Sequence, residues 1–363
     1  MILNNYIKSI FSFFIYLTLC LSAIANATEN TALNKLMTDT VVPFISGAKI
    51  PGTAIAIYYK DQEYYFNYGF ADKKKNIPVT ENTIFELASI TKIFVTTLLA
   101  VEVKEGKIHL SDSAIGYIPR LAKIRGLPIN NVKVVNLATH TSGFPRQMEQ
   151  FGVQKGDING FYNLLSIWRP SVPIGTQYKY SNIGFGFLGS VVEEAAGNTL
   201  PVLLKQKITQ PLGMTHTYFK VPEDQKNLEA QGYRPDKRPA PYYIAANFLG
   251  GGALRSSAVD LMQFMKANLG IKVGNASPQL LSAMQFAQQP HFFVKPRFVM
   301  GLGWQRVKHG QGLLITKNGG NQGFSTFIGF SPSKQIGVVV LTNQAKSKAT
   351  LLGNQILKGL LAL

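Results

Sequence analysis

The chain has 363 residues, of which 46% are hydrophobic and 11% aromatic, so it can bury a large core and is not a disordered protein. Its formal net charge is +18. The lysines are scattered along the chain instead of being gathered in one arm, which argues against a nucleic-acid-binding protein. Attraction to an anionic envelope surface stays open.

The N-terminus predicts export. Lys8 precedes an apolar run from Ile10 to Leu21, and the small residues of Ala23-Ile24-Ala25-Asn26-Ala27 suit signal peptidase. We therefore expect residues 1–27 to be a removed signal peptide and the protein to be periplasmic. An uncleaved anchor is the alternative, but the run is shorter than the roughly 20 apolar residues that span a bilayer.

The single cysteine, Cys20, lies in that segment. A lipid anchor on Cys20 is the less favoured alternative, because the preceding Leu19 is bulkier than the small residue usual there. Without the segment the mature chain has no thiol, which excludes a cysteine nucleophile and thiolate metal sites. Its net charge is then +17.

Hydrophobic periodicity predicts strands at both ends and helices between them. Alternating residues at 53–59 and 63–68 indicate one β-hairpin, and those at 323–330 and 336–341 a second. Helices are expected at 89–104, 182–196, 257–269 and 348–361. The sequence thus predicts a mixed α/β (α+β) fold, in which both termini build one antiparallel sheet with flanking helices and an inserted helical domain.

We expect one hydrolase domain over residues 28–363. Its sheet parts cover about 28–80 and 300–363, and its helical part covers about 81–299. The space between the two layers is the natural place for a site.

Ser89-Ile90-Thr91-Lys92 places a hydroxyl and an amine three residues apart, on one face of the predicted helix. A desolvated lysine can take the proton of a serine nucleophile, and a helix start favours a developing oxyanion. The same spacing occurs at Ser46 and Ser331, where glycine or proline opposes a helical face. Ser89 is therefore the candidate, and a simple helix cap is the alternative.

Two further motifs carry polar chemistry. Tyr180-Ser181-Asn182 opens the helix expected at 182–196, where a tyrosine can relay a proton and an asparagine can bind an amide. Lys317-Asn318-Gly319-Gly320 combines a cation with glycines that admit a ligand close to the backbone, although a glycine-rich turn is the simpler interpretation. The chain has no Gly-x-Ser-x-Gly or His-Glu-x-x-His motif, and its five histidines are widely spread.

In this order, Phe85 to Lys92, Tyr180 to Asn182 and Lys317 to Gly319 resemble the three motifs of class C β-lactamases and related D,D-peptidases. Asn136 to Gly143, Pro211 to Met214 and Gly301 to Trp304 are also similar to that family, so the resemblance covers nearly the whole mature chain. It implies the β-lactamase/D,D-peptidase fold, covalent acylation, no cofactor and no metal. A monomer is expected.

The resemblance also implies residue roles. Ser89 is similar to the acylated nucleophile, Lys92 to its proton acceptor, and Tyr180 to the base for acylation or for the deacylating water. The backbone N–H groups of Ser89 and Gly320 match the oxyanion hole. The expected substrate-binding residues are Asn182, Lys317, Asn318, Gly319, Gly320 and, across a one-residue gap, Gln147.

Several departures leave the substrate open. Asn318 replaces the usual threonine or serine, and the stretch from Trp304 to Lys317 is shorter than in typical class C enzymes. We therefore expect β-lactam hydrolysis through an acyl-enzyme on Ser89, with a D,D-carboxypeptidase or esterase as the alternative. A third hypothesis is a penicillin-binding sensor that is acylated without turnover.

Overall fold

The structure is a computed structural model that describes residues 31–123, 125–147, 151–153, 157–242, 249–310 and 312–363. The predicted signal peptide and Cys20 lie outside these residues. The strands are β1 (Gly52–Tyr59), β2 (Gln62–Asp72), β3 (Ile77–Pro78), β4 (Phe85–Glu86), β5 (Arg255–Ser256), β6 (Phe292–Lys295), β7 (Phe298–Met300), β8 (Gln305–His309), β9 (Gly312–Gly320), β10 (Ser325–Ser331) and β11 (Ile336–Thr342).

The helices fall mostly between the two groups of strands. One helix covers residues 31–48. The others are α2 (Thr91–Lys104), α3 (Val134–Ala138), α4 (Ile158–Ile167), α5 (Asn182–Ala196), α6 (Leu200–Leu204), α7 (Gln210–Leu212), α8 (Ala258–Asn268), α9 (Pro278–Gln288) and α10 (Ala349–Ala362). None of the helices in the described ranges is long and apolar enough to cross a membrane.

Both ends of the chain build one sheet. Within the described residues the strand order is β3-β2-β1-β11-β10-β9-β8-β7-β6, with antiparallel neighbours throughout. β1 pairs with β11 in a register that sets Ile55 opposite Val340. The N-terminal hairpin is thereby joined to the C-terminal strands, and β9, which carries the third motif, lies two strands from β11.

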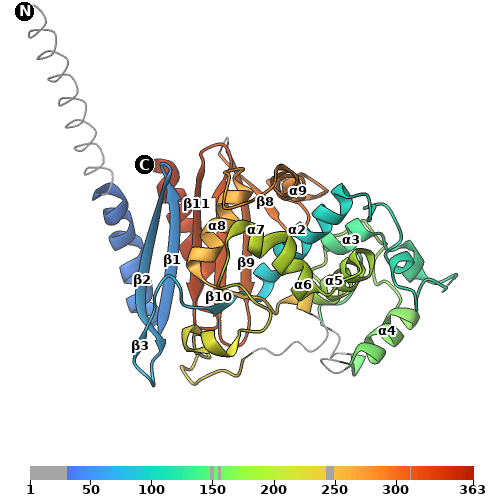
Figure 1. Cartoon of the computed structure of the whole chain (residues 1–363), viewed down its shortest axis with the longest axis horizontal. Coiled ribbons are helices and arrows are strands. Elements are labelled where there is room, and N and C mark those ends of the chain that lie inside the picture. The colour runs from blue at the N-terminus through green and yellow to red at the C-terminus, as the bar shows by residue number, and fades with distance from the viewer. Residues whose placement is uncertain (1–30, 124, 148–150, 154–156, 243–248, 311) are drawn as a thin grey trace, which may run out of the picture.

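Side chains of β1 alternate between two cores, as the pleat of a strand requires. Ala54 and Ala56 face the core that includes α2, α5 and α8, whereas Ile55 and Ile57 face a second core with the helix of residues 31–48 and α10. Figure 1 shows those two helices together on the outer side of the sheet and the inserted helices on the other side. Ser89 lies in the inserted layer, where it meets the sheet.

The structure confirms both predicted hairpins and the four predicted helices, with small shifts of their ends. It corrects three details. The helix of residues 31–48 was not anticipated. β6 and β7 already belong to the sheet, although they lie in the range assigned to the helical part. Ser89 does not open the α-helix itself, because it lies in a single 3₁₀ turn, η1 (Ala88–Ile90), and α2 begins at Thr91.

Candidate active site

Ser89 is held at the start of a helix by strained backbone. Ala88 has a φ of +48°, which residues with a side chain rarely adopt, and such strain persists where the surroundings impose it. The neighbours Ala88 and Ile90 are buried, while Ser89 is partly exposed. The hydroxyl is thus open to a ligand at the positive end of α2.

Lys92 lies one turn further and is fully buried beneath Ser89. Its Nζ is 3.2 Å from Ser89 Oγ and 2.9 Å from Asn182 Oδ1, and it also contacts the Gly251 carbonyl oxygen. Burial, and to a smaller extent the charge of Arg146, lower the pKa of Lys92 to about 7. A neutral amine fits these contacts, because two N–H groups serve Asn182 and Gly251 while the lone pair faces Ser89.

Tyr180 reaches the same oxygen from the segment that precedes α5. Its hydroxyl donates to Ser89 Oγ at 2.6 Å. The ring centre lies 5.1 Å from Lys92 Nζ and 5.3 Å from Lys317 Nζ, within the range of a cation–π contact. Ser89, Lys92 and Tyr180, which the sequence predicted as a unit, are therefore brought together around one hydroxyl.

β9 forms the facing wall. Lys317 is buried, and burial lowers its pKa to about 8. A side chain at Gly319 would overlap the Leu87 carbonyl oxygen and come within 3.1 Å of the Ser89 backbone nitrogen, so this glycine lets the strand lie directly against the Ser89 turn. The same carbonyl oxygen accepts from the Thr326 hydroxyl at 2.9 Å, which ties β10 to this point as well.

Three other predicted residues are exposed to solvent. Asn318 and Gly320 are exposed and alternate with the buried Lys317 and Gly319 along β9. Gln147 is also exposed. The substrate-binding roles expected for these positions stay predictions.

His140 lies beside the site, although nothing in the sequence singled it out from the five widely spread histidines. It is buried, has a φ of +59°, and its ring centre lies 4.3 Å from that of Tyr180. Its carbonyl accepts the N–H of Lys179 at 2.7 Å, and its Nδ1 accepts the N–H of Ser181 at 3.1 Å. His140 therefore holds both neighbours of Tyr180, a role that only the folded arrangement reveals.

The protonation state of His140 follows from its surroundings. Burial lowers its pKa well below the usual value, and the charges of Lys317 and Lys92 act in the same direction. A neutral ring can accept the Ser181 N–H at Nδ1, whereas an imidazolium would turn two donors toward each other. Within the described residues no group of three or more histidine, cysteine or acidic side chains is placed to hold a metal.

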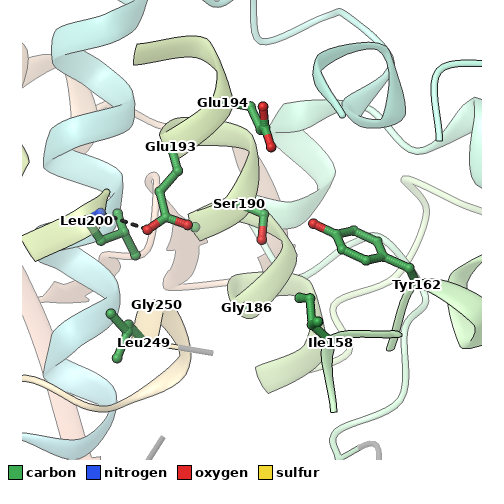
Figure 2. Close-up of a pocket in the computed structure, with 10 residues that line it drawn as sticks. Ile158, Tyr162, Gly186, Ser190, Glu193, Glu194, Leu200, Leu249 and Gly250 are labelled. Atoms are coloured by element: carbon green, nitrogen blue, oxygen red, sulfur yellow. Dashed lines mark hydrogen bonds between the residues drawn. The ribbon is translucent and has the colours of Figure 1, made fainter. Parts of the chain in front are cut away.

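A separate cavity of about 220 Å³ lies along α5, between α4, α6 and Leu249–Gly251 (Figure 2). In Figure 2 the Tyr162 hydroxyl points toward Ser190, and Glu193 accepts the Leu200 N–H at 2.7 Å. Burial raises the pKa of Glu193. No lysine or histidine lines the described part of this cavity, so Ser190 has no base comparable with Lys92.

The fold is that of the penicillin-binding-like serine hydrolases. The β-lactamase family model matches residues 36–361, so the chain belongs to the β-lactamase family and is a hydrolase.

Individual relatives agree with this assignment. A β-lactamase of Pseudomonas fluorescens is 29% identical over 349 residues, which cover 86% of this chain and 94% of the relative. The structure of a β-lactamase/D-alanine carboxypeptidase from Pseudomonas syringae has a TM-score of 0.83 at 26% identity and covers 90% of this chain and 99% of its own. The D-alanine carboxypeptidase AmpC from Burkholderia cenocepacia has a TM-score of 0.80 at 28% identity, with coverage of 90% and 98%.

Proposed function

We propose that the protein hydrolyses β-lactams through an acyl-enzyme on Ser89. The observation that carries this proposal is the pair of contacts at Ser89 Oγ, to Lys92 Nζ at 3.2 Å and to Tyr180 Oη at 2.6 Å. A hydroxyl between a neutral amine and a phenol can lose its proton as it attacks a carbonyl carbon. The substrate class follows the names of the family and of the relatives.

In the acylation step Ser89 Oγ forms a bond to the carbonyl carbon of the lactam. Its proton passes to Lys92 or Tyr180 and then to the lactam nitrogen as the ring C–N bond breaks. The backbone N–H groups of Ser89 and Gly320 would bind the oxyanion, while Lys317 would orient Tyr180 and hold the substrate carboxylate. In the second step water attacks the ester carbonyl carbon. Its proton passes to Tyr180 as Tyr180 hands its own proton to Lys92, and a proton returns to Ser89 Oγ as the ester C–O bond breaks and the acid product leaves.

A D-alanine carboxypeptidase or esterase is the second candidate. Two of the similar solved structures are named for D-alanine carboxypeptidase activity. β8 and β9 pair with each other and make up most of the short stretch between Trp304 and Lys317, so we expect few residues there to enclose a substrate on that side of the site.

We also propose that the protein is exported to the periplasm after loss of residues 1–27 and acts there as a monomer.

Intact-mass spectrometry over time after mixing with a penicillin tests this function. We expect an adduct of the penicillin's mass that maps to Ser89, then decays, and is absent in Ser89→Ala. The protein should also hydrolyse a chromogenic cephalosporin and a small p-nitrophenyl ester slowly, and both activities should depend on Ser89.

The outcomes separate the candidates. A stoichiometric adduct that persists would favour a penicillin-binding sensor. Release of D-alanine from a peptide ending in D-Ala-D-Ala, with slow lactam turnover, would favour the carboxypeptidase. An adduct in Ser89→Ala would disprove the assignment of the nucleophile.

A further inference from the structure

Arg146 is exposed beside the candidate active site, and the sequence predicted no role for it. Its backbone carbonyl accepts the N–H of Asn182 at 3.0 Å, which fixes the segment to the start of α5. Its guanidinium carbon lies 5.3 Å from the ring centre of Tyr180, the ring whose hydroxyl contacts Ser89. The side chain therefore lies beside Tyr180, on a segment that is bound to the start of α5.

Three basic side chains surround the Tyr180 ring, and Arg146 is the exposed one. Lys92 and Lys317 approach the same ring to 5.1 and 5.3 Å but are buried, whereas Arg146 is open to solvent. In the described parts of the chain none of the three forms an ion pair with an acidic side chain. The charge of Arg146 is thus not compensated by an ion pair within the described residues.

The guanidinium is suited to bind an anion. One face lies over an aromatic ring, and its planar fork still offers N–H donors at the exposed edge for a carboxylate. Lys317 belongs to β9, where the proposed function places the substrate carboxylate that lies on the leaving-group side of the scissile bond. Arg146 belongs to the helical layer, because its carbonyl accepts the N–H of Asn182 at the start of α5, and the proposal places the acyl side chain of the substrate on that side.

We propose that Arg146 is an anion subsite for the acyl side chain, so that the enzyme prefers acyl donors carrying a carboxylate there. This inference rests on the proposed acylation of Ser89. Because the contact is solvent-exposed, its effect is modest, about 5- to 10-fold in the rate of acylation. The preference decreases as salt screens the charge.

A matched pair of substrates tests the subsite. Carbenicillin differs from benzylpenicillin by one carboxylate on the acyl side chain. We expect the wild-type protein to be acylated about 5- to 10-fold faster by carbenicillin than Arg146→Gln is, with a much smaller difference for benzylpenicillin. Arg146→Lys should keep part of the preference because it keeps the charge.

Arg169→Gln is the matched control, because this guanidinium donates to the carbonyls of Ile167 and Trp168 and has no contact with Tyr180. It should behave as the wild type. An unchanged carbenicillin-to-benzylpenicillin ratio in Arg146→Gln overturns the subsite. If Ser89→Ala is still acylated, the proposed function fails instead, so the two failures are distinguishable.

A second readout reports where the Arg146 charge lies. Its charge helps to lower the pKa of Lys92, so Arg146→Gln should raise that pKa and move the acid limb of ester hydrolysis to higher pH. The other titratable groups close to Lys92 are Tyr180, Lys317 and His140, which are the same in both proteins. An acid limb that stays in place, with an unchanged substrate ratio, overturns the proposal.

Discussion

The substitution Gly319→Ala adds one methyl group where β9 lies against the Ser89 turn, and it tests how close that packing is. A Cβ there would overlap the Leu87 carbonyl oxygen and the Thr326 hydroxyl, whereas real Cβ atoms essentially never come closer than 3.0 Å to such atoms. The Leu87 oxygen belongs to the backbone and cannot rotate away. Gly319→Ala must therefore move β9 and the Ser89 turn apart by about 1 Å in a tightly packed interior.

The size of the effect follows from that displacement. A misplacement of about 1 Å costs on the order of 10² in rate, and the loss of one oxyanion donor costs about 10² to 10³. We expect Gly319→Ala to slow Ser89 acylation about 10²-fold or more. The assay is time-resolved labelling by a fluorescent penicillin, carried out below the melting temperature of each variant.

Gly116→Ala is the matched control, because a Cβ at Gly116 would meet no atom within 4 Å. It makes the same chemical change away from β9 and should label at the wild-type rate. Folded Gly319→Ala that labels as fast as the wild type would refute the close packing of β9 on Ser89. Equal slowing in both variants would refute the specific contact as well.

The remaining predictions concern protonation. Lys92 must be neutral to take a proton and has a pKa of about 7, so acylation should fall tenfold per pH unit below that value. Lys317 must be charged to hold a carboxylate and has a pKa of about 8, so acylation of anionic substrates should also fall above pH 8 in stopped-flow assays. The lowered pKa of His140 means that the unfolded chain binds a proton that the folded one excludes, so stability should fall as pH drops below about 6.5. His140→Asn, whose amide oxygen can still accept, should flatten this loss in urea unfolding, whereas a wild-type slope would contradict the buried neutral ring.

Much of the fold was predictable because its patterns are local. The alternation in β1 and β2 is a property of neighbouring residues, and the structure confirms the hairpin that it predicted. The helix of residues 31–48 was missed because its sequence gives a weak local signal. It contains Pro43 and β-branched residues, and its buried Leu33, Met37 and Val41 pack in the core shared with α10.

The order of the three motifs predicted which segments meet, but not what completes the site. The carbonyl of Gly251 contacts Lys92 across 159 residues of sequence. A backbone carbonyl has no residue-type signal, so no sequence pattern could have indicated it. The lowering of the Lys92 pKa by the charge of Arg146 could not be predicted either, because only folding brings these two residues close together.

His140 explains why Tyr180 can work beside two lysines. Its ring and carbonyl fix the residues before and after Tyr180, so the phenol is aimed at Ser89 by bonds that involve neither its hydroxyl nor the substrate. A charged imidazolium would add a buried cation beside Lys92 and Lys317, the two lysines whose pKa values burial already lowers. The low pKa of His140 is therefore a requirement of the site: the ring must be polar enough to hold the backbone and uncharged enough to leave the proton balance of Ser89, Lys92 and Tyr180 intact.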